Sequence, residues 1–372
     1  MFLRIAAMAA LGIWVYLLLA RGRFWRMDVS SAGATRAGSA ARVAAVIPAR
    51  NEAEVIGEAV ASLARQQYGG AFHIVVVDDA SEDQTPEAAR AAAPPERVTI
   101  IRGAPLPSGW TGKLWAVFQG IAEAKRFQPD YLLLTDADIV HPPGGLEELV
   151  AQAESGYDLV SWMVTLRCES FAERALIPAF VFFFFMLYPP AWIRSTRHKT
   201  AGAAGGCMLL RYAMLEQIGG IASIRGELID DCALARAVKQ QGGRVWLGLG
   251  AGARSIREYG TFAEIGRMIS RTAFTQLRYS AALLALTVAG LAITFLFPVM
   301  AALRSSGYGI AAWALMGVAY LPVLRYYRRS MFWAPLLPLV AVFYMGATMH
   351  SAIEYWRGRG GMWKGRAQSQ RR

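Results

Sequence analysis

The stretch Tyr131-Leu132-Leu133-Leu134-Thr135-Asp136-Ala137-Asp138 decides the fold. Its apolar first half predicts a buried strand, and two carboxylates follow at the point where that strand ends. Asp136 and Asp138 are two positions apart, so they can hold one divalent cation between them. Strand-end turns also favour aspartate for conformational reasons alone. The pair therefore needs support from the rest of the chain.

Further strands with polar ends lie upstream. Strand-like runs cover residues 43–47, 74–77 and 98–101. The first ends in the polar segment 48–52 and the second in 78–81, and helical patterns follow at residues 55–63 and 87–93. Strands that alternate with helices predict a parallel α/β sheet with right-handed crossovers. In such a sheet the ligand crevice lies beyond the carboxyl ends of the strands.

Six segments resemble, in order and spacing, the motifs of family 2 glycosyltransferases. They are Pro48-Ala49-Arg50-Asn51-Glu52, Val77-Asp78-Asp79-Ala80-Ser81, Gly109-Trp110-Thr111-Gly112-Lys113, Thr135-Asp136-Ala137-Asp138, Ala201-Gly202-Ala203-Ala204-Gly205-Gly206-Cys207 and Asp230-Asp231-Cys232-Ala233-Leu234-Ala235. The resemblance covers residues 43–280. It implies a GT-A-type α/β fold, a mostly parallel sheet with helices on both faces. With its apolar segments, the chain looks most like the bacterial hopanoid-biosynthesis-associated glycosyltransferases.

The resemblance also implies roles for individual residues. Those that match nucleotide-sugar-binding positions are Pro48, Ala49, Glu52, Asp79, Lys113, Asp136 and Arg278. Asp138, supported by Asp136, would hold the Mn²⁺ or Mg²⁺ that neutralises the leaving diphosphate. Lys113 is placed to approach that diphosphate, although a solvated loop lysine is the alternative.

The acceptor needs a proton acceptor on the face opposite the leaving group. Asp231 matches the family's catalytic base, and Asp230 stands beside it in a supporting role. Capping of the helix that follows is the alternative for both residues. Direct attack by the acceptor would invert the anomeric centre.

One departure concerns the stretch Thr275-Gln276-Leu277-Arg278-Tyr279. Processive and lipid-directed relatives carry Gln-x-x-Arg-Trp there. Arg278 is kept, whereas threonine and tyrosine replace glutamine and tryptophan. The altered pattern argues against synthesis of a long polymer and indicates transfer of a single sugar.

Composition indicates a membrane-bound protein. The 372 residues are 55% hydrophobic, with a net charge of +12 and a mean hydropathy of +0.30. Many arginines flank apolar segments, as expected at an anionic membrane surface, and no basic run is interleaved with aromatics as in nucleic-acid-binding motifs. Nucleic acid is therefore not an expected partner. The three cysteines have no metal-ligand spacing and give no disulfide framework.

The apolar segments give the expected layout. It comprises an N-terminal transmembrane anchor (1–27), a linker (28–42), the catalytic domain (43–280), a C-terminal transmembrane region (281–352) and a basic tail (353–372). Arg21, Arg23 and Arg26 follow the first apolar stretch, which favours an uncleaved anchor with the following residues in the cytoplasm.

Two apolar regions can each be assigned in more than one way. Residues 283–300, 310–324 and 332–349 are candidate spans, and Pro335 and Pro338 make the last one doubtful. Residues 176–193 carry three prolines and predict an interfacial helix, with a full span or a buried helix as alternatives.

Together these features predict a multi-pass protein of the bacterial inner (cytoplasmic) membrane with a cytoplasmic catalytic domain. Its expected activity is inverting transfer of one sugar from a nucleotide-sugar donor to the hydroxyl of a lipid acceptor, a hopanoid by the narrower resemblance. One alternative is a polyprenyl-phosphate sugar synthase, whose phosphate acceptor could use Arg194, Arg197 and Lys199. The other is a non-catalytic membrane scaffold that kept the fold.

Overall fold

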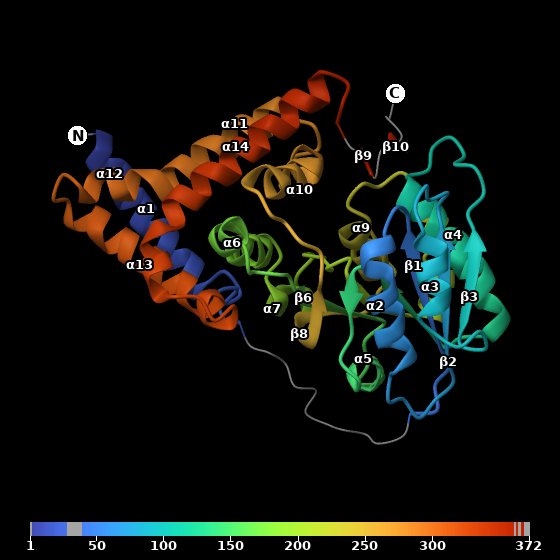
Figure 1. The fold of residues 1–372 in the computed structure, drawn as a ribbon. Helices are drawn as coiled ribbons and strands as arrows, with labels where there is room; N and C mark the ends of the chain where they lie inside the picture. Colours follow the sequence, from blue (N-terminus) through green and yellow to red (C-terminus); the bar gives the residue numbers. More distant parts are fainter. Residues whose placement is uncertain (1, 28–38, 361, 364–365, 368–372) are drawn as a thin grey trace. The chain divides into compact units, whose positions relative to one another are not determined.

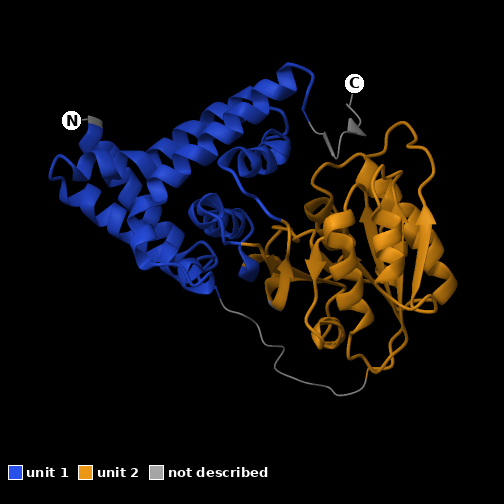
Figure 2. Ribbon diagram, in the orientation of Figure 1, with its two compact units in different colours: residues 1–27, 168–191, 258–361 blue, residues 28–167, 192–257, 362–372 orange. Residues whose placement is uncertain are grey.

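The computed structural model describes the chain except for residues 1, 28–38, 361, 364–365 and 368–372 (Figure 1). It divides into two compact units (Figure 2): unit 1 is residues 1–27, 168–191 and 258–361, and unit 2 is residues 28–167, 192–257 and 362–372. Most of the predicted linker lies outside the described residues. Residues 168–191 and 258–280 group with the apolar helices of unit 1, so the sequence-based domain limits stay predictions.

Unit 2 is built on an eight-stranded sheet with the order β3-β2-β1-β4-β7-β6-β8-β5. Its strands are β1 (Val43–Ala49), β2 (Phe72–Asp78), β3 (Val98–Arg102), β4 (Tyr131–Thr135), β5 (Ile139–Val140), β6 (Leu159–Thr165), β7 (Cys207–Arg211) and β8 (Val245–Ser255). The first four strands in this order are parallel, which confirms the predicted α/β fold. β7 runs antiparallel to β4 and β6, so the complete sheet is mixed.

Helices pack against both halves of the sheet. They include α2 (Ala53–Ala64), α3 (Thr85–Ala91), α4 (Gly112–Ala124), α5 (Gly145–Glu154), α8 (Tyr212–Gln217) and α9 (Asp230–Gln240). Ile56, Val60 and Leu63 of α2 are buried at helical spacing and share a core with alternate residues of β1. α4 packs on β1 and β2 through Gly120, where a Cβ would lie 2.4 Å from a methyl group of Val46 on the other face of β1.

Unit 1 is helical. Its helices are α1 (Phe2–Leu19), α6 (Phe171–Leu187), α10 (Phe262–Gln276), α11 (Ala281–Leu291), α12 (Phe297–Ala302), α13 (Gly307–Tyr326) and α14 (Leu337–Trp356), and α7 (Pro190–Arg194) begins in it. Among the described residues, four segments are long and apolar enough to cross a membrane: Phe171–Arg194, Ala281–Ala302, Gly307–Tyr326 and Met331–Trp356. Apolar helices that could span a membrane therefore exist where the sequence predicts a C-terminal membrane region.

The two prolines do not interrupt the helix of the last candidate span, whose crossing of a membrane stays a prediction. Pro335 lies in a 3-10 turn, and Pro338 lies in the first turn of α14. Proline is tolerated there because the first amide groups of a helix have no intrahelical partner. α14 then continues without a break for the rest of its 20 residues.

α6 packs differently from the interfacial helix expected at residues 176–193. Eleven of its seventeen residues are buried, and the Tyr344 hydroxyl donates a hydrogen bond of 2.9 Å to the Leu176 carbonyl. The Phe182 ring meets Tyr320 edge-on with 5.3 Å between centroids. This burial corresponds to the buried-helix alternative, and the segment also meets the length and composition of a span.

The N-terminal apolar stretch is a helix, as predicted. α1 packs on α12 and α13, and its Trp14 indole donates a 2.9 Å hydrogen bond to the Thr294 carbonyl. Its apolar part, Leu3–Leu19, is shorter than the four candidate spans. Its role as an anchor therefore stays a prediction.

The packing of α4 can be tested by replacing Gly120 with alanine. The new methyl group would meet Val46 and Val77 at 2.4 and 2.8 Å, so we expect the free energy of unfolding to fall by about 1–3 kcal/mol. Gly57→Ala is the matched control, because its Cβ would meet only the Ala88 carbonyl oxygen at 3.7 Å and alanine favours a helix by up to about 1 kcal/mol. Urea unfolding of the detergent-solubilised chain measures both. Equal stability of the two variants would contradict this packing.

Candidate active site

The site lies where the parallel strands of unit 2 end. Parallel strands bring their carboxyl ends to one edge of a sheet, so the segments after β1, β2 and β4 meet there. The antiparallel strand β7 adds another segment to this edge. Thr135, the last residue of β4, pairs with Cys207, the first residue of β7. Gly205 and Gly206 therefore lie beside Asp136.

The ends of β1 and β2 are tied together by hydrogen bonds. The Asp79 amide donates to the Ala49 carbonyl at 2.8 Å, and the Arg50 guanidinium donates to the Asp79 carbonyl at 2.5 Å. The Glu52 amide donates to the Thr85 hydroxyl at 2.7 Å. These bonds gather Ala49, Glu52 and the buried Asp79 at one place, next to Pro48. All four are nucleotide-sugar-binding candidates from the sequence.

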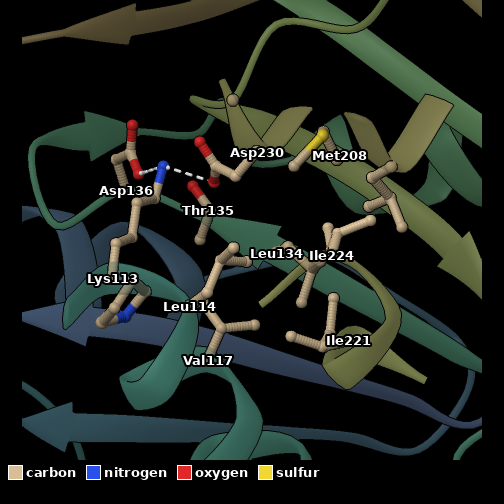
Figure 3. Close-up of a pocket in the computed structure, with 13 residues that line it drawn as sticks. Lys113, Leu114, Val117, Leu134, Thr135, Asp136, Met208, Ile221, Ile224 and Asp230 are labelled. Carbon is tan, nitrogen blue, oxygen red and sulfur yellow. Dashed lines mark ion pairs between the residues drawn. The ribbon is translucent and has the colours of Figure 1, made fainter. Parts of the chain in front are cut away.

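Lys113 lies between two carboxylates at the start of α4 (Figure 3). Its ammonium nitrogen is 2.9 Å from Asp136 Oδ1 and 3.2 Å from Asp230 Oδ2. Thr111, the N-cap residue of α4, accepts a hydrogen bond from the Leu114 amide and fixes this first turn. The Lys113 side chain is only 19% exposed. The alternative of a solvated loop lysine is therefore wrong.

The charge state of Lys113 follows from its neighbours. Burial acts to lower the pKa of Lys113, but the carboxylates of Asp136 and Asp230 outweigh burial and raise that pKa. Lys113 is thus a fixed positive charge at neutral pH. Its ammonium group contacts both Asp136, a candidate metal ligand, and Asp230, which is next to the candidate catalytic base. Asp136 and Asp230 lie almost a hundred residues apart in the sequence.

Asp138 has different partners from Asp136. The Ser255 hydroxyl donates a 2.5 Å hydrogen bond to Asp138 Oδ2, and Arg257 Nη2 lies 3.6 Å from Asp138 Oδ1. The same Arg257 nitrogen donates to both carboxylate oxygens of Glu52 at 2.7 Å. β5 pairs with the end of β8, and this pairing brings Ser255 next to Ile139. Sequence reasoning missed Ser255 and Arg257, whose only signal was their place at the end of a strand.

The strand-end carboxylates could serve as ligands of a divalent cation. In the described part of the chain, no three histidine, cysteine, aspartate or glutamate side chains gather where they could hold a metal ion. Mg²⁺ commonly uses one or two carboxylates and takes its other oxygens from substrate phosphates and water. Asp136 and Asp138 supply such carboxylates at one strand end. Their chemistry fits a cation that binds together with a diphosphate.

Asp231 lies in the first turn of α9. Its Oδ2 accepts a 2.9 Å hydrogen bond from the Gly205 amide, and its Oδ1 accepts one of 2.6 Å from the Cys232 amide. The N-cap residue of α9 is Ile229, which makes no side-chain cap bond. Neither Asp230 nor Asp231 is therefore the N-cap residue that the alternative reading requires.

The surroundings of Asp231 favour a proton acceptor. Burial and the adjacent Asp230 carboxylate raise the pKa of Asp231 to about 6, whereas Lys113 and the two amide donors act in the opposite direction. A carboxylate with this pKa is mostly ionised at neutral pH and is still more basic than an exposed aspartate. These are the properties that a general base needs.

The glycine segment before β7 links the two halves of the site. A Cβ on Gly205 would lie 3.3 Å from Asp231 Oδ2 and 3.4 Å from Lys113 Nζ, so a larger residue would crowd both charges. The Gly206 carbonyl accepts a 2.8 Å hydrogen bond from the Thr135 hydroxyl. That hydroxyl also lies 3.0 Å from Nε2 of the buried His141, and burial lowers the pKa of His141 to about 4. Thr135 and the neutral His141 were not among the predicted site residues.

A small hollow lies beside Lys113 (Figure 3). Its polar side carries Lys113, Asp136 and Asp230, and its apolar side includes Leu114 and Ile221. The ion pairs thus lie next to an apolar wall.

Arg278 is the one predicted site residue in unit 1. It follows α10 and has a left-handed backbone conformation with φ of 52°. Its predicted role at the diphosphate stays a prediction.

Known proteins resemble about half of this chain. The model of the glycosyl transferase family 2 matches residues 44–219. An undecaprenyl-phosphate 4-deoxy-4-formamido-L-arabinose transferase of Pseudomonas fluorescens is 30% identical over 175 residues, 46% of this chain and 46% of the relative. A transferase of the same name from Edwardsiella ictaluri is 32% identical over 136 residues, 36% of this chain and 40% of the relative. The chain thus spans about half the length of the curated relatives it matches.

A solved structure supports the fold. The mannosyltransferase of Pyrobaculum calidifontis, solved in complex with GDP-Man and Mn²⁺, superposes with a TM-score of 0.56. The superposition covers 96% of this chain and 99% of that one, at 19% sequence identity. At this identity the likeness shows a GT-A-like fold and nothing more specific. Residues 44–219, which match the family 2 glycosyltransferase model, include the Asp136–Asp138 pair and the strands β2 to β7.

Proposed function

We propose that this chain is a membrane-bound glycosyltransferase that moves a single sugar from a nucleotide-sugar donor to a lipid acceptor. The observation that carries the proposal is the Lys113 ion-pair cluster. Through it, the strand-end carboxylate Asp136 and the helix-start pair Asp230 and Asp231 lie at one point of the sheet edge. The residues that would bind the donor and the residue that would remove the proton thus lie next to each other.

The donor half of the site uses the segments after β1, β2 and β4. Asp79 and Glu52, gathered with Ala49, would hold the nucleoside, and Lys113 would face the diphosphate. Asp138 and Asp136 would hold Mn²⁺ or Mg²⁺, which when bound neutralises the charge of the leaving diphosphate. The basic side chains of Lys113 and Arg257 form ion pairs with these carboxylates and would hold them in position.

The acceptor half of the site is centred on Asp231. Its carboxylate would take the proton from the acceptor hydroxyl as the oxygen attacks the anomeric carbon. The Gly205 amide and the start of α9 hold the carboxylate in position for this step. A single direct displacement of this kind inverts the configuration of the sugar.

Two acceptor chemistries have support. The raised pKa of Asp231 favours an acceptor that must lose a proton, which is a hydroxyl such as that of a hopanoid. The names of the relatives favour a lipid phosphate, since those enzymes act on undecaprenyl phosphate. A phosphate is already ionised at neutral pH and has less need of a base. We propose the hydroxyl as the primary acceptor and the lipid phosphate as the second.

The membrane part of the proposal rests on the four apolar segments and on the arginines after α1. Arg21, Arg23 and Arg26 favour a cytoplasmic position for the residues that follow α1. Nucleotide sugars are cytoplasmic, so this orientation would give the site its donor. We therefore propose the bacterial inner membrane, with the catalytic domain on the cytoplasmic side.

Incubation of the purified chain with a panel of nucleotide sugars and lipids tests the function. We expect mass spectrometry to detect one lipid that gains one sugar in Mn²⁺ or Mg²⁺, with no product after chelation. Asp138→Ala should lower turnover by roughly 10²-fold or more, because no bound cation would then neutralise the negative charge of the leaving diphosphate. Asp130→Ala is the control, since Asp130 pairs with Arg42 at the start of β4, away from the site.

The lipids should include a hydroxylated hopanoid, undecaprenyl phosphate and plain phospholipid vesicles. A product on undecaprenyl phosphate alone would favour the second acceptor. Absence of a product from every donor and lipid would refute the proposed function. Wild-type turnover in Asp138→Ala would remove the metal assignment.

Replacement of Asp231 by asparagine tests the base. Asparagine keeps the size and the carbonyl acceptor for the Gly205 amide but loses the basicity. We expect turnover to fall roughly 10²- to 10⁴-fold with donor binding preserved. In the wild type, turnover should fall as the pH drops below about 6, because Asp231 then binds a proton and cannot accept another. The residual activity of the variant should not show this fall in turnover at low pH.

Asp130→Asn is again the matched control. An Asp231→Asn variant that keeps more than about a tenth of wild-type turnover would move the role of base to another residue.

A reporter fusion tests the orientation. Alkaline phosphatase joined after residue 270 should be inactive, because this reporter folds only outside the reducing cytoplasm. A β-galactosidase fusion at the same residue, which is active only in the cytoplasm, is the reciprocal control. Active alkaline phosphatase with inactive β-galactosidase would overturn the orientation and the cytoplasmic donor.

A further inference from the structure

Lys239, at the far end of α9 from Asp231, has an unusual set of partners. Its ammonium group donates hydrogen bonds to four backbone carbonyls, those of Trp192, Ser195, His198 and Thr200, at 3.4, 3.1, 2.9 and 2.8 Å. All four carbonyls belong to one short segment that begins in α7 and leads into the glycine segment. An ammonium has three protons, so two of the four carbonyls share one of them. Because the four carbonyls are spread along the segment, this one side chain fixes the path of its backbone.

We call residues 192–206 the strap. Its first part is also tied to β8, because the Arg194 guanidinium donates to the Leu247 carbonyl at 3.1 and 3.0 Å and lies 4.9 Å from the centre of the Trp246 ring. The rings of Trp192 and His198 stack on each other at 4.8 Å. The first part of the strap is thus held on several sides.

The other end of the strap is tied to the opposite end of the same helix. The Ala204 amide donates to the Ser161 hydroxyl at 2.8 Å, and the Gly205 amide donates to Asp231 Oδ2 at 2.9 Å. Asp231 and Lys239 are eight residues apart on α9, a rise of about 12 Å along the helix. One rigid helix therefore holds the strap at both ends, with the proposed base at one end and Lys239 at the other.

The strap presents basic side chains within the part that Lys239 holds. Arg197, His198 and Lys199 are exposed, whereas the backbone beneath them is held by Lys239. A segment that displays positive charge and ends at the base is suited to receive the headgroup of an acceptor. The attachment at Lys239 would set how far that headgroup lies from Asp231.

We propose that Lys239 is a positioning residue that holds the strap in place for the acceptor. This inference rests on the proposed function, because it concerns the acceptor of that reaction. Lys239 acts through the backbone of the strap and touches neither substrate.

The test is Lys239→Met, which keeps the length of the side chain and removes the four hydrogen bonds. We expect the KM for the lipid acceptor to rise roughly 10-fold or more, since small misplacements of bound groups are costly in rate. The dissociation constant for a nucleoside diphosphate in Mn²⁺ should stay unchanged. Trypsin should cleave the membrane-embedded chain faster after Arg197 and Lys199. Lys239→Arg keeps the charge and several donors and should restore much of the acceptor KM.

The control is Lys125→Met, because Lys125 is an exposed lysine in the turn after α4 and has no bond to the strap. Wild-type acceptor KM in Lys239→Met would overturn the inference, even with faster cleavage. The inference would also be overturned if the dissociation constant for the nucleoside diphosphate rose by the same factor as the acceptor KM. The substitution would then have disturbed the whole site and not the acceptor side alone. If wild-type protein gives no transfer at all, the proposed function fails, while unchanged trypsin cleavage of Lys239→Met separately refutes the attachment.

Discussion

The single positive charge of Lys113 is the constraint on which the site depends. Two carboxylates, Asp136 and Asp230, lie within ion-pair distance of this ammonium, and Asp231 is next in the chain to Asp230. Like charges at such distances repel, and burial adds to the cost of ionisation. Burial, followed by the adjacent Asp230 carboxylate, raises the pKa of Asp231. A diphosphate would add more negative charge, which the cation proposed at Asp136 and Asp138 would offset.

The topology explains how these charges come together. The parallel strands supply the segments after β1, β2 and β4, as any doubly wound sheet does. β7 then pairs antiparallel with β4, so the residues before β7 arrive at the edge where β4 ends. As a result, the Gly206 carbonyl meets Thr135 and the Gly205 amide meets Asp231. The antiparallel insertion is what joins the donor half of the site to the base.

The sequence predicts the parts of this arrangement that depend on local patterns. Apolar runs that end in polar residues located β1, β2 and β4, and a shared sheet edge then brought Asp79 and Asp136 into one site. Sequence patterns could not give the pairing of β5 with β8, which is set by contacts more than a hundred residues apart and brings Arg257 to Asp138. They also leave α6 unassigned, because hydropathy does not distinguish a helix buried by protein from one that lies at an interface.

The two lysines that bond to this site act on it in different physical ways. Lys113 contributes charge: its partners are carboxylates, so its loss would leave like charges uncompensated. Lys239 contributes geometry, since its partners are neutral carbonyls of one segment. Both act through α9, which carries Asp230 and Asp231 in its first turn and Lys239 in its last. Because a helix of 11 residues is stiff, the separation between the base and the start of the strap is fixed by the helix itself and does not depend on a flexible loop. A transferase that must align a lipid headgroup with a sugar gains from this, because alignment within a bound pair supplies much of the rate.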